Sequence, residues 1–452
     1  MHSWRDYHER TKHTPDGLRQ ASPALDWANM PDLFREYEGV PVLDLPADPP
    51  EPGMGGVADG AERLSQLFFY SAANSAAKQT ATGRRYALRV NPSSGNLHPT
   101  EFHFITGGLA NWPDGVYHYR CSAHMAEQRA TAIAQPGLQV VLTSVAWREA
   151  WKYGDRAYRY CLLDAGHAAE ALRLAAQASG CPAEVNAGFN DVAVAEALHL
   201  PDDEWPLVQV NVNAPPGGIA WQAIEKPAGT PGQLSRNPLR SEGIEAIHRL
   251  TSALSPAPWR WPASPGPLSL GDAMSFGKAA RSRRSALDFR QGDETLSPAQ
   301  LGLLLAVANP GLITLYLYIH RVEGIAPGLY RYDPHAGELT PLRAGDQRVA
   351  IAGLSLRQDL AGNACLALSM VADLDTAART YGDRGYRYAH FEAGAIGQRL
   401  YLAATALGLG ATGIGGFFDD ATHRYLGIAP QQGQVVYHFA LGHPVPDHRL
   451  TP

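Results

Sequence analysis

The sequence predicts an α+β protein built from two tandem copies of one domain. The 48 residues that begin at Tyr153 and the 48 that begin at Tyr381 align without a gap and share 21 identities. A shorter repeat lies upstream of each segment, where residues 115–119 (GVYHY) match residues 328–332 (GLYRY). Helical and strand-like patterns do not alternate as regular βαβ units, which favours an α+β arrangement over a doubly wound sheet.

Composition excludes several classes of function. The chain has 452 residues, 18% of them charged, and a formal net charge of -6, so it lacks the basic surface typical of nucleic-acid-binding proteins. No apolar run reaches the roughly 18 residues of a transmembrane helix, and the polar N-terminus is not a secretory signal. Four cysteines without CxxC spacing form neither a disulfide framework nor a zinc ribbon. We therefore expect a cytoplasmic protein without a nucleic-acid or membrane partner.

Shifts in composition divide the chain into four segments. The first 40 residues are polar and rich in His and Arg. Ten prolines between residues 215 and 267 indicate a linker that runs over the surface, with one helical stretch at 242–253. We expect an N-terminal arm at 1–40, a first domain at 41–213, a Pro-rich linker at 214–269 and a second domain at 270–452.

Hydrophobic spacing predicts the main elements of each copy. Apolar residues at helical spacing predict helices over 158–179 and 386–407, with alanines where close packing is expected. Alternating or continuous apolar runs predict strands at 102–105, 138–142, 207–211, 316–319 and 435–439.

A glycine-rich segment follows the second predicted helix. Residues 408–413 fit the GxGxxG pattern, but a dinucleotide fingerprint follows a strand and opens a helix, whereas these glycines follow a helix and precede a strand-like run. We therefore reject a dinucleotide site. Residues 413–417 (GIGGF) instead place bare backbone N–H groups in a loop that a planar ligand can approach closely. A helix cap followed by a turn is the alternative.

Arg283, Arg284 and Ser285 stand at the start of the second copy. Two guanidinium groups and a hydroxyl within three residues suit a phosphate, because arginine donates paired hydrogen bonds to its oxygens. A solvated basic surface is the alternative interpretation.

The first copy holds two further candidate segments. Residues 91–99 (NPSSGNLHP) predict a polar loop stiffened by prolines, with an ordinary Asn/Ser turn as the alternative. Lys152 and Tyr153 can act as acid and base only if the site brings their pKa values, about 10.4 and 10 in water, toward neutrality; a surface lysine beside a packed tyrosine is the alternative. His98 and His103 lack a third ligand at suitable spacing, so we expect no metal site.

Together these segments resemble the nitroreductase superfamily and, within it, the SagB/ThcOx-type dehydrogenases, which oxidise azolines in ribosomal peptides. The resembling pieces are RRS at 283, PSSGNLHP at 92, the two GxYxY strands, KYGDRAYRY at 152 and ALGLGATGIGGFFDD at 406. The resemblance implies α+β domains that bind FMN and pair into a dimer with active sites at the interface. In a duplicated chain it implies an intramolecular pseudo-dimer, either as a monomer or as a larger homodimer.

The two copies have kept complementary parts of this pattern. The first copy has the PSSGN loop and Lys152 but no arginine pair, and it has 185–189 (VNAGF) where the second copy has the glycine loop. The second copy has the arginine pair, but it is about 24 residues shorter across the loop region and has Thr380 in place of the lysine. The resemblance therefore implies one complete flavin site per chain, with the second copy as its cradle and the first as its roof, and an empty opposite site.

The resemblance also implies a role for each site residue. It places Arg283, Arg284, Ser285 and, less directly, Arg449 on the phosphate and ribityl end; Gly415 and Gly416 opposite flavin N5; Pro92, Ser93, Ser94 and Asn96 along the isoalloxazine edge; and Lys152 and Tyr153 as the catalytic pair. One departure is Leu287, which stands where the family has a third arginine, so that Arg290 is left as a weak substitute.

These roles predict an FMN-dependent oxidoreductase that transfers a hydride between a substrate carbon and flavin N5. The branch of the family implies an azoline or imine-like bond in a modified peptide or small molecule, reoxidation of the flavin by oxygen, and peptide-modifying enzymes as partners. A nicotinamide-driven reductase of nitro, quinone or enone compounds is one alternative. A flavin-less scaffold for a peptide-modifying complex is the other.

Overall fold

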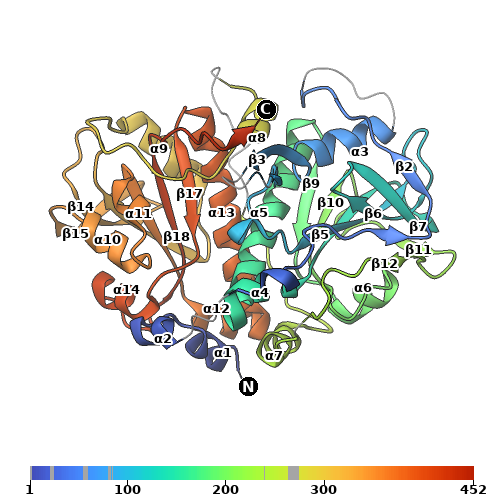
Figure 1. Ribbon diagram of the computed structural model, residues 1–452, viewed down its shortest axis with the longest axis horizontal. Helices are drawn as coiled ribbons and strands as arrows, with labels where there is room; N and C mark the ends of the chain where they lie inside the picture. The colour runs from blue at the N-terminus through green and yellow to red at the C-terminus, as the bar shows by residue number, and fades with distance from the viewer. Residues whose placement is uncertain are drawn as a thin grey trace. The chain divides into compact units, whose positions relative to one another are not determined.

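The computed structural model describes residues 3–20, 25–53, 60–79, 83, 85–238, 240–262 and 274–451. The chain divides into two compact units (Figure 1). The first unit is formed by residues 25–261, and the second by residues 2–24 together with 262–451.

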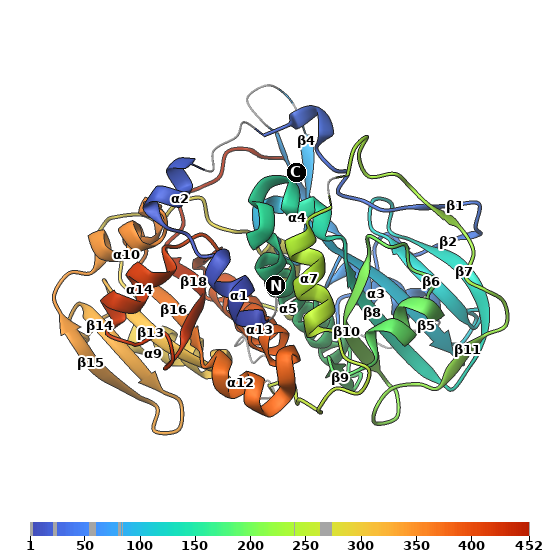
Figure 2. The ribbon, with the colours of Figure 1, turned by 90° about the horizontal axis from the view of Figure 1, so that it is seen from below.

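The first unit is built on an eight-stranded antiparallel sheet. Its strand order is β11-β7-β6-β5-β8-β10-β9, with β2 added beside β7. The strands are β2 (Val42–Asp44), β5 (Thr100–Gly107), β6 (Gly115–Arg120), β7 (Met125–Ala134), β8 (Gly137–Ser144), β9 (Ala183–Asn186), β10 (Trp205–Val212) and β11 (Trp221–Ala223). The helix α5 (Ala157–Ala178) packs on β8 and β10 and is almost entirely buried, because α3 (Gly60–Phe69) and α7 (Glu242–Thr251) also pack against it (Figure 2).

The second unit repeats this sheet. Its six strands follow the order β15-β14-β13-β16-β18-β17, which matches β7-β6-β5-β8-β10-β9 of the first unit strand for strand. They are β13 (Ile313–Ile319), β14 (Gly328–Asp333), β15 (Glu338–Ala344), β16 (Leu366–Ala372), β17 (Gly410–Ile414) and β18 (Gln434–Gly442). The helix α13 (Gly385–Ala406) takes the place of α5. The α+β class and the tandem duplication are confirmed.

The remaining elements are short. They are α1 (Trp4–Arg10), α2 (Pro15–Gln20), α4 (Ala146–Tyr153), α6 (Asp191–Ala197), α8 (Phe276–Ser282), α9 (Pro298–Ala308), α10 (Arg348–Leu354), α11 (Asp359–Asn363), α12 (Leu374–Tyr381), α14 (Asp419–Leu426), β1 (Tyr37–Glu38), β3 (Asn74–Gln79), β4 (Arg85–Arg89), β12 (Thr230–Pro231) and β19 (Leu450–Thr451), with 3-10 turns at Trp27–Asn29, Ser94–Asn96, Gly154–Arg156 and Gly382–Arg384. The predicted long helices and all five predicted strands are confirmed to within a few residues. Within the described ranges, no helix combines the length and the hydropathy that crossing a bilayer requires.

The two units differ by one insertion each. In the first unit, α3 is followed by the hairpin β3–β4 and the polar loop before β5, whereas in the second unit α9 turns almost directly into β13. Conversely, α10 and α11 lie between β15 and β16, whereas β7 and β8 are joined by a tight turn. Each insertion brings candidate site residues into its own unit.

The Pro-rich segment is more than a surface tether. Ser241 caps α7 by accepting a hydrogen bond from the Ile244 N–H at 3.1 Å. Ile244, Ile247 and Trp261 are buried in the first unit. The interpretation of this segment as a surface linker is therefore wrong for α7 and for the residues around Trp261, which contribute to the core.

The N-terminal helix α1 belongs to the second unit, although the first copy follows it in sequence. His8 Nδ1 lies 3.3 Å from Tyr386 Oη on α13, and His8 Nε2 lies 3.1 Å from Gln434 Oε1. The His13 N–H donates to Asp419 at 2.9 Å. The predicted arm is thus divided, and its first helices are part of the second unit.

Candidate functional site

The two arginines that follow α8 form a compact basic cluster. Arg283 ends the helix and is only 4% exposed, with its guanidinium carbon 5.1 Å from the centre of the Tyr401 ring. Arg284 is partly buried, and its Nη1 donates to the carbonyl of Arg281 at 2.9 Å. The structure therefore holds both predicted phosphate ligands on one well-fixed segment of the second unit.

Positive charge accumulates in this cluster. Burial and the neighbouring charges of Arg283 and Arg281 lower the pKa of Arg284 to about 10. Burial also lowers the pKa of Arg283. The neighbouring guanidinium charges repel one another. A phosphate placed among them would relieve this repulsion and accept charge-assisted hydrogen bonds. The donor set fits the phosphate end of a flavin mononucleotide.

Tyr401 joins the arginine segment to the glycine-rich strand. Its hydroxyl lies 2.9 Å from Ser285 Oγ and accepts the N–H of Gly413 at 2.9 Å. Ser285 and Ala411 also form a parallel β-bridge, and the Ala286 N–H donates to the Ala411 carbonyl at 2.9 Å. Two segments far apart in sequence are thus fixed side by side by a tyrosine from α13, which the sequence analysis did not identify.

Neighbouring side chains lie close to the backbone of the glycine segment and leave no room for a larger residue there. A Cβ at Gly413 would overlap the Tyr437 hydroxyl, and one at Gly416 would lie 2.9 Å from Leu356 Cδ1. Gly415 and Gly416 follow the end of β17 and are half-buried. Residues 415–417 leave the end of β17 as a loop, whereas Gly413 lies in the strand, and the approach of a planar ligand to this backbone stays a prediction.

The turn beside this loop has an unusual backbone. Leu356 and Arg357 both have positive φ, 55° and 61°, a conformation that costs energy for residues other than glycine. The turn lies between α10 and α11, and Gln358 Nε2 donates to the Gly416 carbonyl at 3.3 Å. Such conformations persist where the surrounding structure enforces them, as is common beside functional sites.

In the first unit, the polar loop is anchored to α5. The Ser94 N–H and Oγ both donate to the Asp164 carboxyl, at 3.0 to 3.1 Å. Ser93 Oγ accepts the His98 N–H at 2.7 Å, and Asn96 Nδ2 donates to the Ala87 carbonyl at 3.0 Å. The side chains of the loop therefore hold its own shape and fix it to the helix.

The structure brings this loop against the Lys152–Tyr153 pair. A Cβ built on Gly95 would lie 2.5 Å from Tyr153 Oη and 3.1 Å from Lys152 Nζ. Burial, assisted by the charge of Glu149, raises the pKa of Tyr153 well above its ordinary value. The condition for Tyr153 to act as a base, a pKa near neutrality, is therefore not met, and its protonated hydroxyl can still donate and accept hydrogen bonds. Lys152 is exposed at the end of α4.

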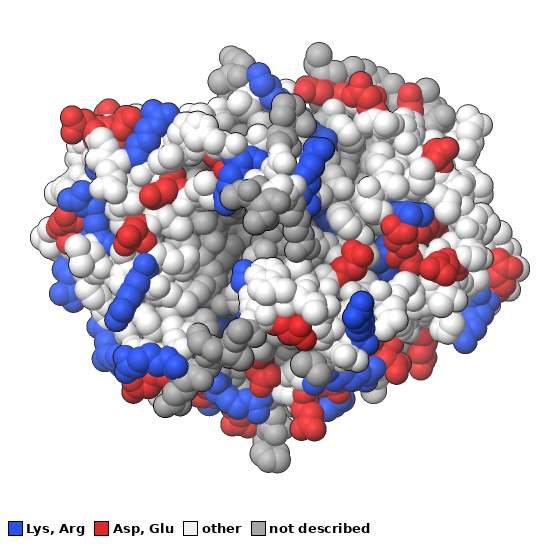
Figure 3. Space-filling model, viewed as in Figure 1, with Lys and Arg blue, Asp and Glu red and all other residues white. Residues whose placement is uncertain are grey.

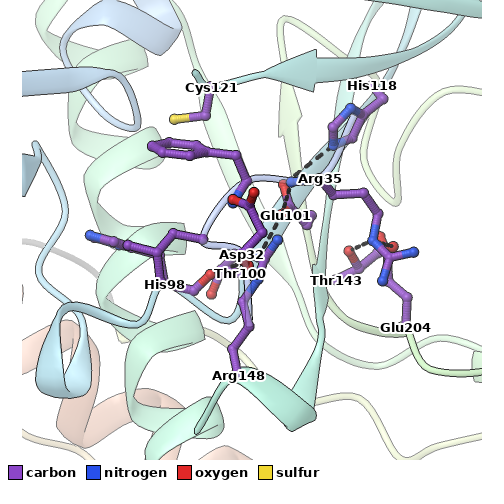
Figure 4. A network of polar contacts seen from close by, with 12 residues as sticks. Asp32, Arg35, His98, Thr100, Glu101, His118, Cys121, Thr143, Arg148 and Glu204 are labelled. Atoms are coloured by element: carbon purple, nitrogen blue, oxygen red, sulfur yellow. Dashed lines mark hydrogen bonds and ion pairs between the residues drawn. The ribbon is translucent and has the colours of Figure 1, made fainter. Parts of the chain in front are cut away.

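A buried ionic network ties the loop and α4 to the sheet (Figure 4). Arg148 of α4 is fully buried, forms an ion pair with Glu101 at 2.6 Å and donates to the His98 carbonyl at 2.8 Å. His118 Nε2 lies 3.3 Å from Glu101. Burial alone would raise the pKa of Glu101, but Arg148 and His118 outweigh it and lower the pKa to about 2. The candidate residues of the first unit thus rest on a rigid support.

The same network extends to a second buried carboxylate. Glu204 accepts hydrogen bonds from His103 at 2.7 Å and Thr143 at 2.6 Å, and it lies 3.2 Å from Arg35 (Figure 4). His103 is therefore engaged in the core and is not paired with His98. Across the described residues, no group of three His, Cys, Asp or Glu side chains is arranged as a metal site.

Two of the weaker sequence candidates, Arg449 and Arg290, have local partners. Arg449 forms an ion pair with Asp447 at 2.9 Å and its side chain is 45% exposed. Arg290 pairs with Glu294 at 3.3 Å, and Leu287 is exposed. A phosphate contact by Arg449 remains a prediction.

The first unit has a different arrangement where the second has Tyr401. The repeat alignment places Arg173 at this position, and its guanidinium pairs with Glu170 through two hydrogen bonds of 2.8 and 2.6 Å. Trp261 Nε1 donates to the same carboxylate at 2.8 Å. Val185 stands where the second copy has Gly413. A buried ion pair therefore occupies the position of the cradle tyrosine.

A groove of about 440 Å³ lies beside α6 in the first unit and contains none of the predicted residues. Its amide side chains already have partners. Asn190 caps α6 by accepting the Ala193 N–H, and Gln209 accepts from Asn186 at 3.3 Å. The surface seen in Figure 3 carries interspersed acidic and basic side chains, in keeping with the small net charge.

Comparison with known proteins gives a consistent result. The nitroreductase family model matches residues 71–213 and 308–443, more than half of the chain and one segment in each copy. A proposed nitroreductase of Anabaena variabilis has a crystal structure that is similar over 98% of this chain and 99% of that one, with 28% identity and a TM-score of 0.78.

Two further similarities are narrower. A proposed nitroreductase of Methanocaldococcus jannaschii is 33% identical over 116 residues, which span 26% of this chain and 59% of that protein. The Escherichia coli microcin synthetase complex McbBCD matches 47% of this chain at 20% identity with a TM-score of 0.30, too weak a likeness to carry an argument.

Proposed function

Because the chain belongs to the nitroreductase family, whose members are typically flavin-dependent oxidoreductases, we propose that it is an FMN-dependent oxidoreductase that transfers a hydride between a substrate carbon and flavin N5. Bound FMN would supply the hydride acceptor, and the protein would supply position and electrostatics.

The observation that carries the proposal is the cradle of the second unit, formed by Arg283, Arg284, Ser285, Tyr401 and Gly413. It combines a partly buried cationic cluster with the glycine backbone at the end of β17, where Gly415 and Gly416 are half-buried. A phosphate needs the first feature, and a planar ring system needs the second. Both features lie on segments held together by one tyrosine hydroxyl.

We assign the substrate side of the reaction to the first copy, on the strength of the sequence pattern. Oxidation of a substrate carbon releases a hydride and a proton, so the hydride acceptor needs a proton acceptor beside it. Lys152 can take or return this proton, and Tyr153, held protonated by burial, can polarise the reacting bond by donating. Pro92, Ser93, Ser94 and Asn96 would border the flavin edge.

For the substrate, we propose an azoline or related imine-like bond in a modified peptide or small molecule, with oxygen as the final electron acceptor. Support comes from the Lys-Tyr pair, which lies against the PSSGN loop through Gly95. The second candidate function is a nicotinamide-driven reduction of nitro, quinone or enone compounds, favoured by the relatives proposed as nitroreductases. Rapid bleaching of the flavin absorbance by NADPH under anaerobic conditions would select the reductase.

The cradle is tested by the double substitution Arg283→Ala with Arg284→Ala. We expect purified double mutant to lose its FMN, because the phosphate loses its charge-assisted hydrogen bonds. Arg343→Ala with Arg348→Ala is the matched control, since it removes the same charge from exposed positions of the same unit. Stoichiometric FMN in the double mutant, or a wild-type protein that cannot be reconstituted with FMN, would overturn the proposed function.

A further inference from the structure

Two buried carboxyl groups lie beneath the Lys152–Tyr153 pair. Glu149 of α4 is fully buried, and Asp164 of α5 is 3% exposed. Asp164 accepts three hydrogen bonds from Ser94, whereas both carboxyl oxygens of Glu149 are buried without a hydrogen-bond partner among the described residues. The charge of Asp164 helps to raise the pKa of Glu149, so the two carboxyl groups are neighbours.

The surroundings of this pair contain little positive charge. From α4 it is faced by Lys152 and Tyr153, from α5 by Tyr160 and Cys161, and from the loop by Ser93 and Ser94. Lys152 is the cation that acts on Glu149, and its side chain is exposed. Arg148, the preceding residue of the helix, is engaged by Glu101. The pair thus differs from four other buried carboxylates of this unit, Glu101, Glu127, Glu170 and Glu204, each of which has an arginine or histidine partner.

Two buried carboxylates in contact cannot both be ionised cheaply, since their like charges repel where water does not screen them. We propose that Glu149 and Asp164 act as a single buried acid, which holds one proton at neutral pH and, through the Ser93–Ser94 turn, positions Lys152 and Tyr153. This inference rests on the proposed function for the role of Lys152 and Tyr153, although the pair itself is a property of the folded chain alone.

The second copy offers an internal comparison. Glu392 occupies the position of Asp164, and its Oε1 accepts backbone N–H groups from residues 311–313 at 2.6, 2.7 and 3.2 Å. Anchoring the neighbouring loop therefore needs only one carboxylate. At the position of Glu149 the second copy has Ala377. The second carboxyl group occurs only in the copy that has Lys152, which points to a function beyond anchoring.

The paired arrangement has consequences for pH dependence. Burial raises the pKa of Asp164 to about 7, and burial together with the Asp164 charge raises that of Glu149 well above its ordinary range. When the shared proton leaves to solvent, a second negative charge appears beside Lys152, and repulsion separates the carboxyl groups. Because Asp164 holds Ser94, the turn loosens, and turnover is expected to fall on the alkaline side.

The decisive variant is Glu149→Gln, which imitates the protonated pair at every pH. We expect it to keep turnover near neutral pH within about threefold and to remove the part of the alkaline fall in kcat that the pair causes, because no second charge can form beside Asp164. Asp164→Asn should instead lower turnover at all pH values, since its amide cannot accept all three Ser94 contacts. Glu392→Gln is the matched control and should leave the alkaline limb in place.

A second readout needs no flavin. An acid whose pKa is raised by folding is stabilising below its unfolded pKa, and this stability is lost as pH rises through the folded value. The unfolding midpoint of Glu149→Gln should therefore increase relative to that of wild type as pH rises from about 5 to about 8. The midpoint of Glu225→Gln should show no such increase, because hydrogen bonds from Thr131 lower the pKa of that exposed carboxyl.

The outcomes separate this inference from the proposed function. Any of three results for Glu149→Gln would overturn the paired acid. They are an alkaline limb of kcat equal to that of wild type, a difference in unfolding midpoint from wild type that does not change with pH, and a folded variant without turnover at any pH. If the holoprotein has no oxidoreductase activity, the proposed function fails, and the unfolding measurement still decides the inference.

Discussion

Gly413 donates its backbone N–H to the Tyr401 hydroxyl at 2.9 Å, and this contact fixes the glycine strand to the central helix of the second unit. The same hydroxyl lies 2.9 Å from Ser285 Oγ. One phenol therefore organises both segments of the proposed cradle, although it lies outside every motif that predicts the cofactor.

Tyr401→Phe should weaken FMN binding without unfolding the protein. The substitution removes two hydrogen bonds, each worth about 1 kcal/mol, so we expect an increase in the FMN dissociation constant of about tenfold or more. Quenching of flavin fluorescence on titration measures the constant. Tyr330→Phe, which removes an exposed hydroxyl bonded to the Ala326 carbonyl, is the control. An affinity equal to that of wild type would remove Tyr401 from the cradle.

Gly95→Ala should impair turnover through a steric clash. Its added Cβ would lie 2.5 Å from Tyr153 Oη, and displacement of a catalytic group by about 1 Å can cost up to 100-fold in rate. Gly180→Ala is the matched control, because that glycine also has positive φ but no atom within 4 Å of the added carbon. Both variants should lose about 1 kcal/mol of stability, since alanine is strained at positive φ. Equal turnover in the two variants would show that the loop does not position Tyr153.

Lys152→Ala should leave FMN bound and slow turnover by about 100-fold, as expected for loss of an acid-base group. Flavin absorbance and steady-state kinetics on the same preparation separate the two effects. Thr380→Ala, the equivalent position of the second copy, should change neither quantity. Unchanged turnover in the lysine variant would exclude Lys152 from the mechanism.

Arg173→Met should destabilise the first unit and spare FMN affinity. It leaves Glu170 as a buried charge without its guanidinium partner, which typically costs about 3–5 kcal/mol. Thermal unfolding measures the loss, and titration with FMN provides the second quantity. A fall in FMN affinity comparable to that of the cradle variants would mean that this position of the first copy also serves a flavin.

Periodicity and repetition were sufficient to predict the architecture. The long helices α5 and α13 are almost entirely buried although each carries several charged residues, and the 21 shared identities place equivalent residues at equivalent points of both helices. The linker was misjudged because prolines mark loops without saying what those loops cover. Trp261 is buried although prolines surround it.

The site was only partly predictable. Short motifs identified Arg283, Ser94 and Lys152, but Tyr401 and Glu149 lie on the long helix α13 and the short helix α4, whose inward faces only the fold defines. The repeat did carry a signal, because Tyr401 aligns with Arg173 and Glu149 with Ala377. The network of Glu101, Arg148 and His118 depends on strand register and on side chains crossing from helix to sheet, so spacing alone could not reveal it.

The most direct test of the account is the amount of FMN bound per polypeptide, measured by flavin absorbance against amino-acid analysis on the reconstituted protein. The account predicts one FMN per wild-type chain. It predicts none when Arg283 and Arg284 are both replaced by alanine. Two FMN per chain, or one that persists in the Arg283→Ala, Arg284→Ala protein, would contradict it.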